Sequence, residues 1–454
     1  MRQWMVAAKK ADFYVIAEKF HVDPVVARII RNREVIGEKN IRIYLGGNLS
    51  DLSDPHQMKD MDRLVEILAQ KIRKQVHIRI IGDYDVDGVT SSHLFLTALR
   101  RVGAKVDVVI PHRIQDGYGL SLHLLQQAKE DGVDTILTCD NGIAAIDEIA
   151  WAKAQKMTVL VTDHHAVPFE EHEGRRTEKK SLADAVVNPH QQDCGYPYKE
   201  LCGAGVAWNV IRVLYENYDM DKREAEDLLD FVAMATVCDV MSLTGENRIL
   251  VKEGLKRIRH TKNIGLQALM QACNVQPENI SAYHFGYVLG PCVNATGRLD
   301  TARHALRLFE TGQETEAEEI ARDLVDLNQE RKELTLQGVE MAKKLCEEGG
   351  YENDPVLVLF LPDVHESIAG LIAGRIREMY NRPVFVLTRG EEGVKGSGRS
   401  TENYSMYENM CGCAELFTKF GGHPMAAGLS LPEENVEKFR RKINENCPLT
   451  VAEG

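Results

Sequence analysis

Short apolar runs alternate with amphipathic stretches over the first half of the chain. The runs VHIRII, DTILTC and MTVLVT are rich in β-branched residues, and the stretches between them, such as SSHLFLTALRRVG, carry apolar residues at helical spacing. Buried strands of a parallel sheet have this continuous apolar character, because helices cover both faces of such a sheet. The alternation therefore predicts an α/β fold with a doubly wound parallel sheet.

The pattern changes twice further along the chain. After Gly203 it becomes helical, and residues 311–348 combine mixed charge with helical periodicity, which indicates a long connecting helix. Near Pro355 a second α/β unit begins, in which GSGRS lies in or beside a strand and FGGHPMAAG forms a glycine-rich turn. We predict a helical segment at 1–70 packed on a catalytic domain at 71–305, a connecting helix at 306–350 and a smaller α/β domain at 351–454.

Composition limits the class of protein. The 454 residues are 44% hydrophobic, which is enough for two or three buried cores. The formal net charge of -13 argues against charge-driven adhesion to nucleic acid over the whole surface, although it allows a local basic groove. No run approaches the ~20 apolar residues of a membrane span, and the N-terminus lacks the apolar core of a signal peptide. Ten cysteines without a CxxC pair favour reduced thiols, so we expect a cytoplasmic protein with no membrane partner.

Acidic residues and histidines follow three of the predicted strands. They are Asp83, Asp85 and Asp87 after VHIRIIG, Asp140 directly after DTILTC, and Asp163, His164 and His165 after MTVLVT. The carboxyl ends of parallel strands meet at one edge of a sheet, so these side chains should converge. Carboxylate and imidazole ligands suit Mg²⁺ or Mn²⁺, and carboxylates at one point repel each other unless cations lie between them. The sequence therefore predicts a metal site with two ions.

Each motif also has an ordinary structural interpretation. The three acids of GDYDVDG alternate along an expected extended turn and should project to one side, but they also fit a solvated acidic turn or a calcium loop. A calcium loop needs a later Glu, whereas this chain continues into an apolar helix. Asn141-Gly142 is also a common turn signal. Asp239, in VCDVMSL on a mostly apolar helix, is either paired or metal-bound, or is a helix-terminal acid.

Taken together and in order, these motifs resemble those of a known superfamily. DYDVDG, CDNG, DHH and the later CD look like motifs I to IV of the DHH phosphoesterases. The segments VVNPHQ, LCGAGVAW, NATGRLDTA and LNQERKEL are similar to the RecJ-type single-strand DNA exonucleases, and GSGRS with FGGHPMAAG is similar to the DHHA1 domain. The resemblance covers nearly the whole chain.

The resemblance implies a metal-dependent 5′→3′ exonuclease that hydrolyses single-stranded DNA to 5′-mononucleotides in DNA repair or recombination. It implies two Mn²⁺ or Mg²⁺ ions, which activate water and stabilise the in-line transition state. The metal ligands it implies are Asp85, Asp87, Asp140, His164 and Asp239, with Asp140 as the bridging ligand and catalytic residue. Asp83 is either a ligand or a positioning residue, because many relatives carry a His where this chain has Ile81. His165 would orient or protonate the leaving group.

Several residues are candidates for binding the phosphates of the strand. Ser397, Arg399, Asn294 and Arg298 match phosphate-binding or substrate-side residues of the RecJ family. Arg113 follows a strand and precedes a glycine turn, and Gly421 and Gly422 would offer backbone N–H groups to which His423 adds a hydrogen bond. A surface arginine, or a packing turn with a capping His, is the alternative in each case. The aromatic candidates for base stacking are Tyr118, Tyr283, His284, Phe285 and Tyr287, although most aromatic side chains belong to cores.

Two other functions are compatible with the same two-domain core. One is a phosphodiesterase for short oligonucleotides or cyclic dinucleotides, and the other is a RecJ-like replication scaffold that has lost its metal ligands. Many RecJ proteins continue into an OB-type domain, whereas this sequence ends at Gly454. We therefore expect either a weaker grip on long DNA or help from a single-strand-binding protein, a helicase or another replication or repair protein.

Overall fold

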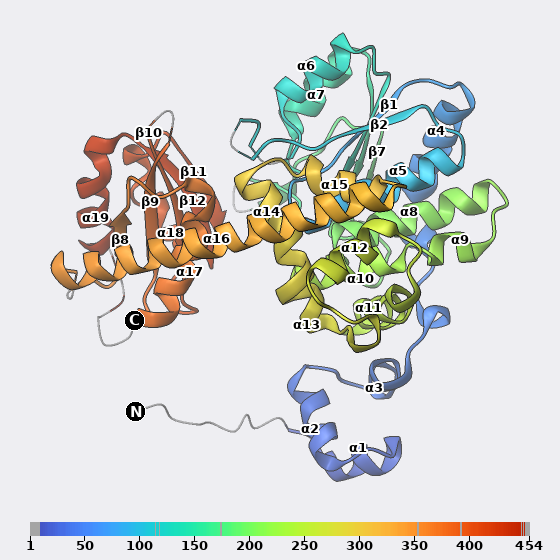
Figure 1. Ribbon diagram of the computed structural model, residues 1–454, viewed down its shortest axis with the longest axis horizontal. Coiled ribbons are helices and arrows are strands. Elements are labelled where there is room, and N and C mark those ends of the chain that lie inside the picture. The colour runs from blue at the N-terminus through green and yellow to red at the C-terminus, as the bar shows by residue number, and fades with distance from the viewer. Residues whose placement is uncertain are drawn as a thin grey trace. The chain divides into compact units, whose positions relative to one another are not determined.

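The chain forms two compact units, Met1–Val325 and Asp326–Gly454. The computed structural model describes residues 10–113, 115–117, 119–172, 175–351, 354–390, 393–445, 447 and 449, without the side chains of residues 171, 172, 175 and 176. The long helix α16 (Glu314–Glu348) contributes residues to both units (Figure 1). No helix within the described ranges is long and apolar enough to cross a membrane.

A five-stranded parallel sheet forms the centre of the first unit, in the order β2-β1-β3-β4-β7 (Figure 1). Its strands are β1 (Ile78–Ile81), β2 (Val106–Val109), β3 (Thr135–Cys139), β4 (Thr158–Thr162) and β7 (Ala185–Val187). The predicted α/β fold with a parallel sheet is confirmed. Because β1 lies between β2 and β3, the order of the strands reverses there, and ligands bind outside the carboxyl ends of strands at such a point.

Helices cover both faces of this sheet, because alternate strand residues point in opposite directions. Ile80 packs in the cluster that contains α4 (Met61–Arg73), α5 (Val86–Arg101) and α8 (Gly203–Asn217). Ile81, the next residue, packs in the cluster that contains α6 (Leu122–Glu130) and α7 (Ile146–Ala154). The apolar runs are therefore continuous because both sides of each strand are buried.

Helices form most of the rest of the first unit. At the N-terminal end lie α1 (Phe13–Phe20), α2 (Pro24–Asn32) and α3 (Glu38–Gly46). After α8 follow α9 (Lys222–Glu226), α10 (Leu229–Cys238), α11 (Gly245–Arg257), α12 (Ile264–Ala272), α13 (Ala282–His284), α14 (Gly290–Leu299) and α15 (Arg303–Glu310). A hairpin of β5 (Phe169–His172) and β6 (Arg175–Glu178) was not predicted, because its polar residues lack the apolar character of a buried strand.

The second unit contains a mixed five-stranded sheet in the order β11-β12-β10-β9-β8. Its elements are β8 (Leu357–Phe360), α17 (Ala369–Tyr380), β9 (Val384–Gly390), β10 (Gly393–Arg399), α18 (Met406–Cys411), β11 (Lys419–His423), β12 (Ala426–Leu431) and α19 (Val436–Glu445). Only β8 and β9 pair in parallel, and the other neighbours are antiparallel. GSGRS lies in β10 and the residue after it, as predicted, whereas the glycines of FGGHPMAAG lie in strands β11 and β12 rather than in a turn.

A buried histidine should make folding sensitive to acid. His93 lies in α5, with its ring 4.4 Å from Phe231 and 5.9 Å from Phe309 between centroids, and its Nδ1 has no hydrogen-bond partner among the described residues. Burial, followed by the charge of Arg100, lowers the pKa of His93 to about 3. Between pH ~6.5 and ~3 the unfolded chain therefore binds a proton that the folded chain does not, and stability falls as the pH falls.

We expect His93→Leu to make the acid side of the stability profile shallower by up to about 1.4 kcal/mol per pH unit, the slope for one proton. Urea unfolding between pH 7 and pH 4 measures this slope. The surface substitution His190→Gln is the control and should keep the wild-type slope. Equal slopes for His93→Leu and wild type would contradict the assignment.

Candidate active site

The first acidic motif lies at the carboxyl end of β1 and continues into α5. Asp83 is buried directly after the strand, and its Oδ1 has no hydrogen-bond partner among the described residues. Asp85 caps α5, accepting a hydrogen bond from the backbone N–H of Gly88 at 3.0 Å, and Asp87 lies in the first turn of the helix. The prediction that these acids alternate along an extended turn was wrong, because the helix begins at Val86 and turns Asp85 and Asp87 apart.

The second motif holds Asp140 in an unusual backbone conformation. Asp140 follows β3 with φ 62°, in the left-handed region, which few residues other than Gly, Asn and Asp adopt. The side chain of Asn141 donates to the backbone oxygens of Ile81 at 3.1 Å and Cys139 at 2.9 Å. These bonds tie the end of β3 to the end of β1, so the surrounding structure fixes the Asp140 carboxylate at the switch point of the sheet.

Asp163 of the third motif organises the two histidines that follow it. Its Oδ1 accepts hydrogen bonds from the backbone N–H groups of His164 at 2.7 Å and His165 at 3.0 Å, and contacts His165 Nδ1 at 2.8 Å. Its Oδ2 accepts from the backbone of Ile143 at 2.9 Å. With both oxygens engaged, Asp163 positions the imidazoles, and His164 is turned toward the other motifs.

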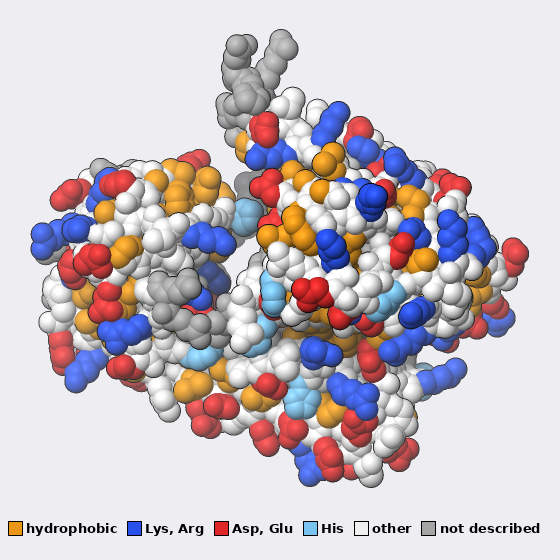
Figure 2. Space-filling model, turned by 90° about the horizontal axis from the view of Figure 1, so that it is seen from above, with side chains coloured by type: hydrophobic (Ala, Val, Ile, Leu, Met, Phe, Trp, Pro, Cys, Tyr) orange, Lys and Arg blue, Asp and Glu red, His pale blue; other side chains and the backbone are white. Residues whose placement is uncertain are grey.

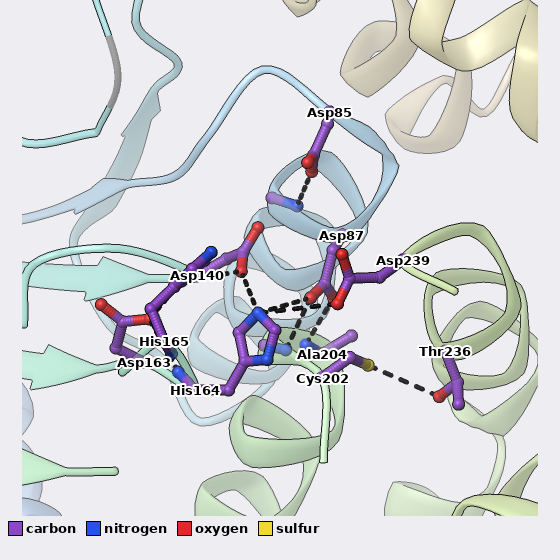
Figure 3. Close-up of polar contacts among 12 residues, drawn as sticks. Asp85, Asp87, Asp140, Asp163, His164, His165, Cys202, Ala204, Thr236 and Asp239 are labelled. Carbon is purple, nitrogen blue, oxygen red and sulfur yellow. Dashed lines mark hydrogen bonds and ion pairs between the residues drawn. The ribbon is translucent and has the colours of Figure 1, made fainter. Parts of the chain in front are cut away.

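His164 lies at the centre of the cluster (Figure 3). Its Nε2 is 3.1 Å from Asp140 Oδ1, 3.7 Å from Asp87 Oδ2 and 3.7 Å from Asp239 Oδ2. Three sets of ligand atoms lie within 4.8 Å of one another and could each hold a metal ion: Asp83, Asp85 and Asp140; Asp87, His164 and Asp239; and Asp140, His164 and His165. The structure thus brings together all the predicted metal ligands, and Asp140 belongs to two of the sets.

Asp239 is the residue that ends α10. It follows Cys238 as the C-terminal cap, where the carbonyl ends of the helix disfavour a negative charge. The next residue, Val240, has φ 58°, a strained conformation for a β-branched side chain. Of the two interpretations of Asp239, the helix-terminal position is therefore correct, and the carboxylate nevertheless joins the cluster.

Sequence reasoning missed the N-terminus of α8 as part of the site. The backbone N–H groups of Gly203 and Ala204 donate to Asp87 at 2.6 and 2.8 Å. A Cβ atom at Gly203 would lie 2.6 Å from Cβ of Asp140, so only glycine fits between the two carboxylates. No spacing in the sequence connects Gly203 with either acid, because the contact arises only when α8 packs against the sheet.

The carboxylates in the cluster repel one another. Burial, and then the charges of neighbouring carboxylates, raise the pKa of Asp83 and Asp140 well above the usual range. The same causes raise the pKa of Asp239 to about 8, and burial lowers the pKa of His164. A divalent cation would favour ionised carboxylates and a neutral imidazole, so this donor set fits Mg²⁺ or Mn²⁺.

His165 has a different environment from His164. Burial disfavours its charge, but the hydrogen bond and charge of Asp163 outweigh this effect and raise the pKa of His165 to about 9. Burial alone would raise the pKa of Asp163, yet its bond to His165 holds that pKa below the usual value. The pair therefore favours an imidazolium held by a carboxylate at neutral pH.

Three predicted phosphate-binding residues lie beside the first motif. The side chain of Asn294, on α14, accepts a hydrogen bond from the backbone N–H of Val86 at 3.2 Å. The guanidinium of Arg113 donates to the backbone oxygen of Gly297 at 2.9 Å and lies 3.8 Å from the ring centroid of Tyr84. Arg298 is one turn further along α14 than Asn294. These contacts hold α14 against motif I. Arg113 and Asn294 therefore have a structural role here in addition to the predicted binding of phosphate.

The other predicted phosphate-binding residues share one sheet of the second unit. The first turn of α17 packs on β10: a Cβ atom at Gly370 would lie 2.8 Å from Arg399 Nη2 and 3.5 Å from Ser397 Cβ. α17 continues from a 3-10 turn, Glu366–Ile368, in which the side chain of His365 accepts a hydrogen bond from the backbone N–H of Ser367. Burial, followed by the charge of Arg377, lowers the pKa of Arg399, and a bound anion would oppose both effects.

The pairing of strands places the Gly-Gly-His segment in line with these residues. Across β12, Ser397 is in register with Gly428 and Gly421, and Arg399 with Ala426 and His423. Paired residues point to the same face of a sheet, so Arg399 and His423 share a face, about 10 Å apart across two strand spacings. Gly422, between Gly421 and His423 on the edge strand β11, has φ 153°.

Comparison with known proteins places this geometry in a family. Residues 77–236 match the DHH family, N-terminal domain, and residues 353–447 match the DHHA1 domain. The chain is 36% identical over 440 residues to the single-stranded-DNA-specific exonuclease RecJ of Haemophilus influenzae, which covers 93% of this chain and 74% of that protein. It is 34% identical over 440 residues to RecJ of Bacillus subtilis, covering 96% of this chain and 54% of that protein.

Solved structures agree with the sequence relatives. The crystal structure of Thermus thermophilus RecJ in complex with Mn²⁺ matches with a TM-score of 0.80 and 29% identity, covering 95% of this chain and 60% of that chain. The complex of RecJ from the same organism with Mg²⁺ matches with a TM-score of 0.74 and 28% identity, covering 95% and 58%. This chain thus spans 54% of the length of the Bacillus subtilis relative and 74% of the Haemophilus influenzae relative.

Proposed function

The chain belongs to the RecJ family of single-stranded-DNA-specific exonucleases, and from this membership we propose that it hydrolyses single-stranded DNA from the 5′ end to 5′-mononucleotides. The observation that carries the proposal is the convergence of Asp87, Asp140 and Asp239 on His164 Nε2. A site that gathers buried carboxylates around one imidazole is unstable without cations and suits hydrolysis of a phosphodiester.

We propose two divalent ions, Mn²⁺ or Mg²⁺, for this centre. One would be held by Asp83, Asp85 and Asp140 and the other by Asp87, His164 and Asp239. Asp140 Oδ1 lies 3.1 Å from His164 Nε2, so Asp140 would serve both sites. When bound, such ions supply Lewis acidity for the phosphate and activation of water. Asp87 is held in place by the N–H groups of α8, and Asp140 by its fixed backbone, so the protein determines where the ligands lie.

His165 is proposed to donate a proton to the leaving oxygen. Its Nδ1 is fixed by Asp163, whose hydrogen bond and charge raise the pKa of His165 and favour the protonated ring. A cationic imidazole beside the reacting phosphate can stabilise negative charge and supply a proton to the leaving oxygen. Asp163 therefore acts through His165, as a positioning residue.

The second unit is proposed to hold the 5′ phosphate. Ser397 and Arg399 lie against Gly370 in the first turn of α17, and His423 and the glycines of β11 share the same sheet. A guanidinium, a hydroxyl and backbone N–H groups are the donors that phosphate oxygens accept from most readily. These residues would make the enzyme prefer strands that carry a 5′ phosphate.

Arg399→Ala is expected to remove most of that preference. Loss of one hydrogen-bonded charge pair should raise KM for a 5′-phosphorylated strand about ten- to hundredfold, with a much smaller effect on a 5′-hydroxyl strand. Arg389→Ala, at an exposed residue paired with Glu433 in the same unit, is the control and should behave as wild type. If Arg399→Ala affected both strands equally, the residue would not read the 5′ phosphate.

The choice of substrate tests the proposed function. Metal-stripped protein would be given Mn²⁺ or Mg²⁺ and offered single-stranded DNA, duplex DNA, RNA and a dinucleotide under the same conditions. Fast release of mononucleotides from single-stranded DNA supports the proposal. Efficient cleavage of the dinucleotide with inert DNA would instead indicate a small-substrate phosphodiesterase, and no cleavage of any substrate would indicate a scaffold.

A further inference from the structure

We propose that Tyr283 and Tyr287 form a stacking platform for unpaired bases of the strand that enters the active site. The proposal rests on the proposed function, since it names how that substrate is gripped. The two rings stack with centroids 5.2 Å apart and an interplanar angle of 24°. Tyr283 is 62% and Tyr287 73% exposed, although aromatic rings of this size are usually buried.

The other aromatic candidates differ from this pair. Phe285 is fully buried in the core, and His284 Nδ1 contacts the hydroxyl of Ser281 at 3.0 Å as part of a capping box. Tyr118 lies outside the described residues. Among the described candidates, the stacked tyrosine pair is therefore the one whose outer ring surfaces are exposed to a ligand.

The tyrosines lie on the same continuous helix as the residues beside the metal centre. α13 passes through a π-helical turn, Phe285–Leu289, directly into α14, and the residues at both junctions keep helical backbone angles. Such π turns occur often at functional sites. Here the wider turn aligns Tyr287 above Tyr283, because four residues come close to one full turn.

The exposed residues of this helix run from the tyrosines toward the active site. Tyr287 precedes Asn294 by seven residues on the same continuous helix, and Arg298 follows Asn294 one turn later. Tyr283 and Tyr287 are exposed and Asn294 and Arg298 are partly exposed, whereas residues between them such as Val293 are buried.

Two glycines pack this helix closely against the acidic motifs. Gly290 packs so closely on Cys238, the neighbour of Asp239, that a Cβ atom would collide with its sulfur, and Gly297 packs in the same way on the backbone oxygen of Tyr84. The helix therefore cannot shift without moving motifs I and IV. The platform is a rigid extension of the site, which is what a subsite for a substrate requires.

The distances match a strand of a few nucleotides. At 1.5 Å per residue, Tyr287 lies about 10 Å and Tyr283 about 16 Å along the helix from Asn294. A stacked strand advances about 3.4 Å per nucleotide, so the platform would meet bases roughly three to five nucleotides beyond the position of Asn294. Stacking on an aromatic face accepts every base. It also does not need positive charge, which suits a chain of net charge -13 whose basic and acidic side chains are interspersed on the face that Figure 2 shows.

A kinetic test separates long from short substrates. The double variant Tyr283→Ala with Tyr287→Ala should raise KM for a twenty-nucleotide strand about tenfold or more, with kcat unchanged, and should leave a dinucleotide unaffected because it cannot reach the platform. Phe at both positions should restore wild-type KM, whereas Leu, which is apolar but has no ring, should not. A pair that only stabilises the helix would lower the melting temperature without changing KM, and that result would overturn the proposal.

A second measurement does not depend on catalysis. A single strand carrying 5-iododeoxyuridine at one position at a time would be bound to the metal-free wild-type protein in EDTA and irradiated. Cross-links to Tyr283 or Tyr287 from positions a few nucleotides apart support the platform, and cross-links elsewhere only would overturn it. If wild type binds and cross-links DNA but never cleaves it, the proposed exonuclease activity fails while the platform stands.

Discussion

Asp140→Asn is expected to reduce phosphodiester hydrolysis by about a thousandfold or more. Asp140 joins Asp83 and Asp85 in one ligand set, and its Oδ1 lies 3.1 Å from Nε2 of His164, a ligand of the other proposed site. Its loss should therefore weaken both proposed ion sites together. The ions supply several kcal/mol of transition-state stabilisation, and each 1.36 kcal/mol is a factor of ten in rate. Asn tolerates the left-handed backbone that this position requires, so the loss would come from the missing charge rather than from misfolding.

The same variant should change the response of stability to metal. Without metal, Asp140→Asn removes one charge from a buried acidic cluster whose pKa values are already raised, so its melting temperature should equal or exceed that of wild type. Adding Mn²⁺ should then stabilise wild type much more than the variant, because only ions that bind the folded state raise its melting temperature. Thermal melts with EDTA and with Mn²⁺ measure this, beside single-turnover rates on single-stranded DNA.

Asp147→Asn is the matched control for this prediction. Asp147 is an exposed acid in the first turn of α7 in the same unit, and its variant should keep wild-type rates and wild-type stabilisation by Mn²⁺. An Asp140→Asn enzyme that retained more than a tenth of the wild-type rate would show that the carboxylate is not central to the reaction.

Gly203→Ala is expected to have the second-largest effect, although it adds only one methyl group and removes no ligand. Its Cβ atom would lie 2.6 Å from Asp140 Cβ and 2.8 Å from Asp140 Oδ1, so the helix or the carboxylate must move. The same residue donates its N–H to Asp87, and movement of α8 would lengthen that bond. Because a displacement of about 1 Å can cost a hundredfold in rate, we expect a loss of at least that size.

Gly205→Ala tests whether position or helix propensity causes the effect. A Cβ atom there would meet Leu201 at 3.4 Å, which is ordinary contact, and Ala is favoured over Gly inside a helix by about 1 kcal/mol. Gly205→Ala should therefore keep full activity with equal or higher stability. Equal activity of the two alanine variants would contradict the packing of α8 on the metal centre.

Much of the fold could be predicted because buried parallel strands have a local signature. Each of β1, β3 and β4 is an apolar run with an acidic residue within two positions of its end, so the sheet and the convergence of the acids followed together. The long helix α16 was also evident from its periodicity. The order of the four motifs was specific enough for the family to be recognised from sequence.

The remaining features depend on contacts between distant segments. No local pattern indicates that Gly203 fits between two carboxylates, or that Tyr283 and Tyr287 stay exposed on a helix in which Phe285 is buried. The preference of glycine for turns predicts a turn at Gly421 and Gly422, but pairing with β12 makes them part of a strand. Tertiary packing overrode local preference in each of these cases.

The most direct test of the account is the position at which labelled DNA is cut. Wild type and Asp140→Asn would be incubated with Mn²⁺ and single-stranded DNA that carries a label at either the 5′ or the 3′ end. The account predicts that wild type releases the 5′ label at once as a mononucleotide while the 3′-labelled strand shortens stepwise, and that Asp140→Asn does neither. Immediate release of the 3′ label, internal cleavage, or equal activity of the variant would contradict it.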